Sequence, residues 1–195
     1  MSIINIKELE SLLYSWQDKR IVGIQGVSDS GKPLGEEVFL TGKEVEEGAI
    51  IGRVKEDDGI EQLPKSQMAI TSDWKRRFYY VDRMVVRSSH KVQEIPGVVG
   101  RYNVAFGTDA THREYVVVEE IGRRHLIIRY RTPGLLPVTV KSGDKERLLG
   151  ENEVIALNRG EETMIRLSGM YGVVGRANDD ALIVDRAWLR IRHLP

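Results

Sequence analysis

The chain has 195 residues, of which 41% are hydrophobic and 30% are charged, a composition typical of a folded globular protein rather than a chain disordered throughout. It contains no cysteine, which excludes disulfides, zinc–thiolate sites and thiol nucleophiles. The apolar runs are shorter than the roughly 20 residues that a membrane span needs, and the first ten residues lack a signal-peptide pattern. We therefore expect a protein without membrane segments, located in the cytoplasm or, if it is viral, in the virion.

The formal net charge is zero, but the charges are divided unevenly along the chain. Residues 29–62 carry ten acidic and four basic side chains, whereas residues 63–135 carry seven acidic and thirteen basic ones. Opposite patches of this kind can steer a charged partner or bring two copies of the chain together. The alternative is that two solvated surfaces simply differ in composition.

Residues 5–18 have the pattern of an amphipathic helix. Asn5 is a favourable N-cap, and Glu8 occupies the acidic position of a capping box. The apolar side chains recur with helical spacing at Ile6, Leu9, Leu12, Leu13 and Trp16. We assign residues 1–19 to an N-terminal helical segment whose apolar stripe docks onto the rest of the chain, with docking onto a partner as the alternative.

From residue 20 onward the chain shows short runs of alternating apolar and polar residues, separated by Gly, Pro, Asn and Asp. The predicted strands are Ile21–Val27, Glu37–Thr41, Ala49–Val54, Arg76–Ser88, Val99–Phe106, Arg113–Glu119, His125–Arg131, Leu136–Lys141, Glu153–Leu157, Thr163–Leu167, Met170–Arg176 and Leu182–His193. Connections this short exclude helical crossovers and favour antiparallel pairing. The predicted fold is therefore all-β, an antiparallel β-sandwich or barrel with one N-terminal α-helix. Residues 20–195 form the β-rich domain, with a weak candidate boundary at residues 93–100.

No motif in the sequence indicates catalysis, a cofactor or a metal. A phosphate-binding loop, a nucleophile elbow and a zinc-protease motif are all absent from the sequence. None of the histidines pairs with another at metal-ligand spacing; they are His90, His112, His125 and His193. We therefore expect a protein that is not an enzyme and that needs no cofactor or metal.

Two predicted strands carry a cationic, partly aromatic face opposite an apolar one. On the first strand this face holds Arg77, Tyr79, Arg83 and Arg87; on the second it holds Arg186, Trp188, Arg190 and Arg192. Arginine binds phosphate bidentately and aromatic rings stack on bases, so both faces are candidates for binding nucleic acid. The alternative is that the arginines keep the strands soluble, which the neutral net charge favours.

Residues 50–72, with the sequence IIGRVKEDDGIEQLPKSQMAITS, resemble the first half of a forkhead-associated (FHA) domain. The matching elements are Ile51-Gly52-Arg53, Leu63-Pro64 and Ile70-Thr71-Ser72. Residues 145–167 are similar to the closing pair of strands of that family. The resemblance implies a β-sandwich that holds a phosphothreonine through Arg53 and Ser72. The sequence departs from the family at Lys75, where the family has a histidine.

Taken together, these features predict a non-catalytic β-sandwich protein that binds another protein or further copies of itself. A subunit of a phage or other multi-protein assembly is one concrete form of this function. A module that binds nucleic acid or a phosphopeptide is the alternative, and an enzyme whose residues meet only in space comes third.

Overall fold

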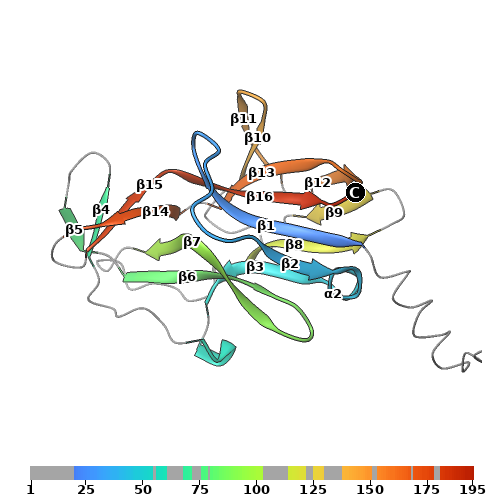
Figure 1. Ribbon diagram of the computed structural model, residues 1–195, viewed down its shortest axis with the longest axis horizontal. Coiled ribbons are helices and arrows are strands. Elements are labelled where there is room, and N and C mark those ends of the chain that lie inside the picture. The colour runs from blue at the N-terminus through green and yellow to red at the C-terminus, as the bar shows by residue number, and fades with distance from the viewer. Residues whose placement is uncertain are drawn as a thin grey trace, which may run out of the picture.

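The computed structural model describes residues 20–54, 56–60, 68–71, 76–78, 80–102, 114–121, 125–129, 138–150, 153–167, 169–177 and 181–195. Most of these residues form β-strands in two sheets, with one short α-helix and one 3-10 turn, η1 (Glu56–Asp58) (Figure 1). The all-β prediction is confirmed. The expected helix at residues 5–18 lies outside the described residues. Across the described ranges, no helix has the length and apolar character needed to cross a membrane.

The smaller sheet has six strands in the order β11-β10-β13-β16-β1-β2. Their bounds are β1 Ile21–Ser28, β2 Val38–Thr41, β10 Val138–Ser142, β11 Lys145–Leu148, β13 Glu162–Leu167 and β16 Ala187–His193. Neighbouring strands in this sheet are antiparallel. Its central pair is β1 and β16, with Ile24 opposite Ile191, so the first and last strands of the described chain lie side by side (Figure 1).

The larger sheet has ten strands in the order β12-β9-β8-β3-β6-β7-β14-β15-β4-β5. Their bounds are β3 Ala49–Arg53, β4 Met68–Thr71, β5 Arg76–Phe78, β6 Tyr80–Arg87, β7 Val92–Tyr102, β8 Glu114–Ile121, β9 His125–Arg129, β12 Val154–Asn158, β14 Met170–Arg176 and β15 Leu182–Asp185. The expectation of antiparallel pairing throughout is wrong for β15 and β4, which pair in parallel with Ile183 opposite Ile70. The long stretch of chain between these two strands permits a parallel return that a short connection would not.

The main core lies between the two sheets and takes alternate residues from strands of both. Ile24 and Ile191 contribute from the smaller sheet, and Ile51, Val118 and Ile128 contribute from the larger one. All five side chains are completely buried. Burying a side chain of this size stabilises the fold by about 1.5–3 kcal/mol, so a shared core of this kind is sufficient to hold two sheets face to face.

Strands β1 and β7 approach each other at a place where only glycine fits. A Cβ atom at Gly26 would lie 2.6 Å from Cγ1 of Val98 and 3.2 Å from the carbonyl oxygen of Pro96. Gly97 has a φ of 81°, a left-handed conformation that glycine adopts without strain. The segment considered as a domain boundary, residues 93–100, therefore forms most of β7 and packs directly against β1.

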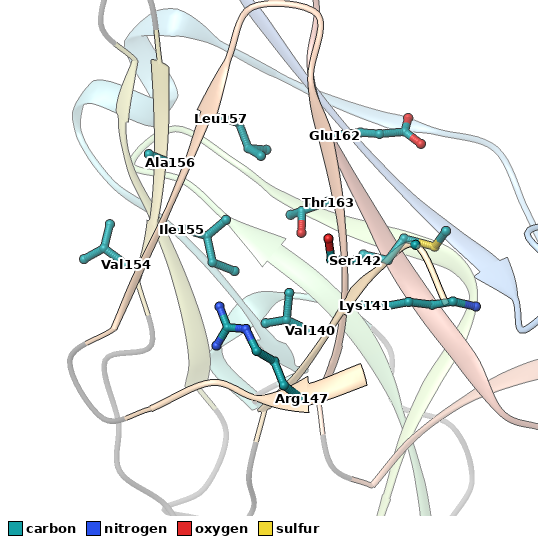
Figure 2. A pocket seen from close by; sticks show the side chains of 12 residues that line it. Val140, Lys141, Ser142, Arg147, Val154, Ile155, Ala156, Leu157, Glu162 and Thr163 are labelled. Carbon is teal, nitrogen blue, oxygen red and sulfur yellow. The ribbon is translucent and has the colours of Figure 1, made fainter. Parts of the chain in front are cut away.

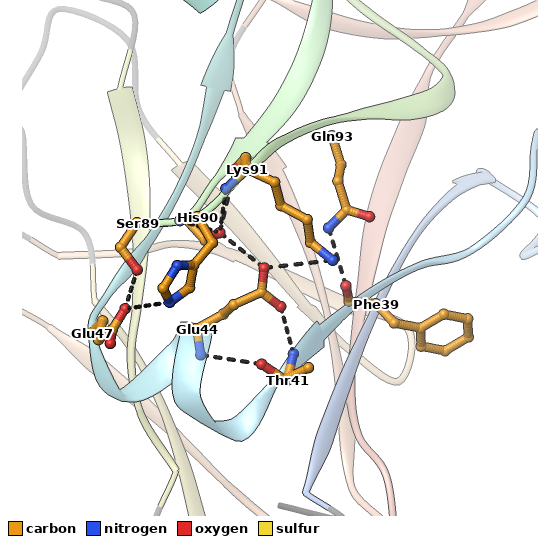
Figure 3. A network of polar contacts seen from close by, with 9 residues as sticks. Phe39, Thr41, Glu44, Glu47, Ser89, His90, Lys91 and Gln93 are labelled. Carbon is orange, nitrogen blue, oxygen red and sulfur yellow. Dashed lines mark hydrogen bonds and ion pairs between the residues drawn. The ribbon is translucent and has the colours of Figure 1, made fainter.

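The short helix α2 (Gly42–Glu46) is joined to the turn between β6 and β7 by a polar network (Figure 3). Thr41 caps the helix: the Glu44 amide donates to Thr41 Oγ1 at 3.3 Å, and the Thr41 amide donates to Glu44 Oε2 at 2.9 Å. The other carboxylate oxygen of Glu44 accepts from the Ser88 hydroxyl at 2.9 Å and lies 3.5 Å from Lys91 Nζ. The Glu44 carboxylate thus fixes two elements that are far apart in the sequence.

Replacing Glu44 by Gln should destabilise the fold in a pH-dependent way. Burial raises the pKa of Glu44, but the hydrogen bonds from Thr41 and Ser88 and the charge of Lys91 outweigh it and hold the pKa below its usual value. A lowered pKa stabilises the folded state above the unfolded-state pKa of about 4.3, and this contribution is lost as the pH falls through the folded-state pKa. We expect Glu44→Gln to lower the free energy of unfolding by about 1–3 kcal/mol at neutral pH.

The measurement is urea unfolding of both proteins at neutral pH and again in acid, where the difference between them should shrink. Glu46→Gln in the same helix is the control, because the Glu46 carboxylate is half exposed and pairs only with Arg20 in the described chain. An equal loss at both pH values would show that the charge of Glu44 is not what stabilises the fold.

Candidate functional site

An open groove lies where the two sheets separate, between β12 of the larger sheet and β10, β11 and β13 of the smaller one (Figure 2). Strands β12 and β13 are consecutive in the sequence, but they belong to different sheets. They diverge from the turn at residues 158–161, where the Glu161 amide donates to the Asn158 carbonyl oxygen at 3.1 Å and Gly160 has a φ of 84°. The groove between the diverging strands has a volume of about 540 Å³.

The turn at the narrow end of the groove is anchored to the end of β16 rather than to a β12–β13 ladder. The Gly160 amide donates to the carbonyl oxygen of His193 at 2.7 Å, and the His193 amide donates to the carbonyl oxygen of Glu161 at 3.0 Å. The His193 ring is completely buried, with Nδ1 3.2 Å from the carbonyl oxygen of Leu157. His193 thus lies between the two strands and keeps them apart.

The groove has an apolar floor and a polar rim. Val140, Ile155 and Leu157 form the floor, and their side chains point toward one another across the groove in Figure 2. The rim carries Arg147, and the buried Thr163 side chain adds a hydroxyl group to the lining. The volume lies in the range of sites that bind small molecules, but the open sides of this groove and its apolar floor also suit an extended peptide segment.

An exposed ion pair links the two sides of the groove at its mouth. Arg147 Nη2 on β11 lies 2.5 Å from Glu153 Oε1, and the other Glu153 oxygen accepts from the Gly150 amide at 2.8 Å. The hydrogen bond to Arg147 lowers the pKa of Glu153, and the same bond raises the pKa of Arg147. Both groups are solvent-exposed, so the ion pair is weak and permits the mouth to open.

Among the described strands, β12 forms one edge of the larger sheet and is paired only with β9. Its sequence, VIALN, contains no charged residue and no proline, and Val154 is 42% exposed. Residues 154–157 all line the groove. Because successive side chains in a strand point to opposite faces, the groove must run along the edge of β12 rather than over one face. Edge strands are normally protected by charges, proline or bulges, and the described length of β12 has neither charge nor proline.

The arginines predicted on β16 and at residue 186 lie together on the outer face of the smaller sheet, where each has a partner within the chain. Arg192 donates two hydrogen bonds to the Glu37 carboxylate, at 2.8 and 2.5 Å. Arg190 donates to the side-chain oxygen of Gln25, and Arg186 bonds to the Glu146 carboxylate. These contacts join β16 and the residue before it to other parts of the smaller sheet, so the predicted cationic face is partly neutralised by the fold itself.

Trp188 is completely buried, so in this conformation its ring is not available to stack on a base as the sequence analysis expected. Its indole Nε1 donates to Asp29 Oδ1 at 2.8 Å. Lys141 Nζ and the guanidinium carbons of Arg166 and Arg186 lie 5.5, 5.0 and 5.3 Å from the ring centroid. The alternation placed Trp188 on the outer face, but long cationic side chains from neighbouring strands cover it there.

The arginines predicted on β6 also have partners within the chain. Arg87 Nε and Nη2 donate to the two Asp58 carboxylate oxygens at 2.7 and 2.5 Å, and Nη2 also donates to the Arg53 carbonyl oxygen. Arg83 Nη1 lies 3.4 Å from Glu94 Oε2. Strand β6 is in the larger sheet and β16 is in the smaller one, so the two predicted arginine groups do not form one continuous face.

The residues nominated by the FHA resemblance are only partly described. Arg53 lies on β3 with its side chain buried, and its Nη1 is 3.7 Å from Asp82 Oδ2. Ser72 and Tyr79 lie outside the described residues, and Arg77 is placed only as part of β5. A joint role of Arg53 and Ser72 in binding phosphothreonine stays a prediction.

The sequence analysis missed the groove and the cations beside Trp188, namely Lys141 and Arg166. The uncharged run VIALN could have indicated an unprotected edge strand, but it does not indicate the groove beside it. Within the described ranges, no group of three His, Asp or Glu side chains is arranged to hold a metal ion.

Comparison with known proteins returns no matching family model, no matching curated protein and no matching solved structure.

Replacing Asp58 by Ala should lower the free energy of unfolding by about 3–5 kcal/mol, because it leaves Arg87 largely buried without its counter-charge. Glu94→Ala is the matched control: it removes the partly exposed partner of Arg83 and should change the free energy by less than about 1 kcal/mol. Urea unfolding measures both. If Asp58→Ala is as stable as the wild type, Arg87 is not a structural residue and becomes a candidate for binding again.

Proposed function

We propose that this protein is a non-catalytic assembly protein that associates with a second copy of itself along the open edge of β12. The observation that carries the proposal is an uncharged edge strand that lines a groove with an apolar floor. Unpaired amide and carbonyl groups on such an edge are a template for another strand. Adding a strand supplies hydrogen-bond partners for the backbone and covers the apolar floor.

The sequence of β12 suits pairing with its own copy. In an antiparallel pair around a two-fold axis at Ile155, Val154 lies opposite Ala156, so the pair does not need Asn158, whose amide and carbonyl groups are already bonded to Glu161. The small side chain of Ala156 lets the two strands approach closely, and no like charges meet across the pair. Two ten-stranded sheets then become one continuous sheet, so each copy covers the edge of the other.

The two edges of the smaller sheet are less suited to pairing. Phe39 on the edge strand β2 is 44% exposed, but its carbonyl oxygen already accepts a hydrogen bond from Gln93 at 3.1 Å. Strand β11, the opposite edge of the smaller sheet, has the sequence KERL and carries three charges in four residues. Charges on an edge strand oppose pairing with a further chain. The comparison favours β12 as the surface that associates.

Part of the uneven charge distribution is neutralised by ion pairs within a single copy. Acidic groups of residues 29–62 pair with basic groups of residues 63–135 in two described contacts, Asp58 with Arg87 and Glu44 with Lys91, and Glu47 Oε2 also lies 3.1 Å from His90 Nε2, which is charged only when protonated. Charges paired in this way are not available to attract a second copy. We therefore assign association to the apolar edge of β12 rather than to opposite charged patches.

Replacing Val154 by Lys should weaken self-association at least tenfold, because it places a charge on the edge that pairs. Val174→Lys is the matched control, since Val174 is 50% exposed but lies on β14, which has β7 on one side and β15 on the other. Sedimentation velocity over a range of concentrations measures both variants and the wild type. A wild type that stays monomeric at the highest concentration, or a Val154→Lys variant that associates as tightly as the wild type, contradicts the proposal.

Salt should have little effect on the association. Pairing through β12 buries uncharged residues, whereas contacts between exposed charges are screened over about 8 Å at physiological ionic strength. We expect light scattering to give the same average mass at low salt and at about 0.5 M NaCl. An oligomer that dissociates as salt rises would instead assign the contact to the charged segments at residues 29–62 and 63–135.

A further inference from the structure

A second pocket lies at the opposite end of β13 from the groove, where β10, β11 and the start of β14 meet. Its volume is about 460 Å³, and its described polar lining includes Arg166, Arg186, Thr139 and Tyr171. Leu148 and Met170 contribute apolar surface beside these groups. The pocket thus combines two guanidinium groups with an apolar wall in a space that fits a small molecule.

Arg166 differs from the other arginines on this face. Its guanidinium lies over the Trp188 ring, and within the described part of the chain no carboxylate lies within ion-pair distance of it. Asp29 and Glu146 act on it electrostatically, but Asp29 accepts the hydrogen bond of Trp188 and Glu146 is bonded to Arg186. Burial lowers the pKa of Arg166 and the charge of Arg186 lowers it further, as expected for positive charge that is incompletely compensated.

Arg186 also has a hydrogen-bond donor that lacks an acceptor among the described residues. Its Nε is buried and makes no hydrogen bond to any described residue, and the Oδ1 atom of Asp29 is 3.7 Å away. The Nη2 atom is bonded to Glu146, so among the described residues Nε has an ion-pair partner in Asp29 but no hydrogen-bond acceptor. A buried donor without an acceptor is destabilising unless a ligand or a water molecule accepts its hydrogen bond.

We propose that this pocket binds the phosphoryl group of a small phosphate monoester, with Arg166 and Arg186 as its phosphate ligands. A phosphate dianion matches two guanidinium groups in charge and accepts bidentate hydrogen bonds from them. The Thr139 hydroxyl is a further donor at the same pocket, and Leu148, Met170 and the Tyr171 ring would contact the organic part of the ester.

The same face does not favour a long polyanion. Arg190 and Arg192 are bonded to Gln25 and Glu37, and the ring of Trp188 is buried. Single-stranded nucleic acid is held by a cationic track with exposed aromatic rings on which bases stack. The described outer face offers a local site for one anionic group instead.

Isothermal titration calorimetry with phenyl phosphate, inorganic phosphate and benzoate tests the proposal. We expect saturable binding of one phenyl phosphate per chain, weaker binding of inorganic phosphate and at least tenfold weaker binding of benzoate. Arg166→Gln should weaken phenyl phosphate binding at least tenfold. Arg159→Gln is the matched control, because Arg159 is an exposed arginine in the turn at the other end of β13, and it should leave the affinity unchanged.

Thermal unfolding without ligand separates a binding role of Arg166 from a structural one. Because Arg166 has no described ion pair but its guanidinium lies over the Trp188 ring, Arg166→Gln should lower the melting temperature by only a few degrees, and phosphate should raise it in the wild type only. Should the variant unfold, Arg166→Lys keeps the charge but removes the guanidinium fork, and it should still weaken binding. Unchanged affinity in the folded Arg166 variant, or equal binding of benzoate and phenyl phosphate, overturns the proposal. Binding of a thymidine oligonucleotide without binding of phenyl phosphate also overturns it, in favour of a nucleic-acid surface.

Discussion

The pairing of β1 with β16 is the contact on which the rest of the structure depends. It runs from Val22 opposite His193 to Ser28 opposite Ala187 and joins the two ends of the described chain. Strand β13 pairs with the other side of β16, and the groove and the phosphate pocket lie at the two ends of β13. A slip of one residue in this pairing would exchange the core-facing and outward-facing side chains of β16, and both sites would lose their walls.

Several arginines of the described chain bind acceptors from other parts of the fold. The bidentate contact of Arg192 with Glu37 is possible because the strand between them carries Gly23, where a Cβ atom would overlap the Glu37 carboxylate. Arg87 makes the equivalent contact with Asp58 in the larger sheet. A residue type that is suited to binding phosphate is equally suited to bridging strands, so arginine content alone does not separate the two roles. The environment of each guanidinium group distinguishes the two roles.

Alternation in the sequence predicted most strands of the structure, because one face of nearly every strand is buried. It failed where that condition is absent. Strand β11 is exposed at every position and carries no apolar alternation, and the helix α2 is too short to show a helical period. Strand β7 begins at Val92. The predicted start was Val99, because proline and glycine, here Pro96 and Gly97, are typical of the end of a strand. They are accommodated where the pairing with β6 shifts register between Arg83 and Val85, as a bulge permits.

Local sequence patterns could not predict the groove, for a different reason. Two consecutive strands joined by a short turn usually pair as a hairpin, and nothing in VIALN or in the turn after it indicates that β12 and β13 enter different sheets. The His193 amide, far along the chain, binds the Glu161 carbonyl oxygen that a hairpin ladder would have used next to the turn. Strand β13 pairs with β10 and β16 instead of β12, so among the described strands β12 has a partner on one side only. The proposed self-association therefore originates in the same β1–β16 register that builds the core, since that register sets where His193 lies.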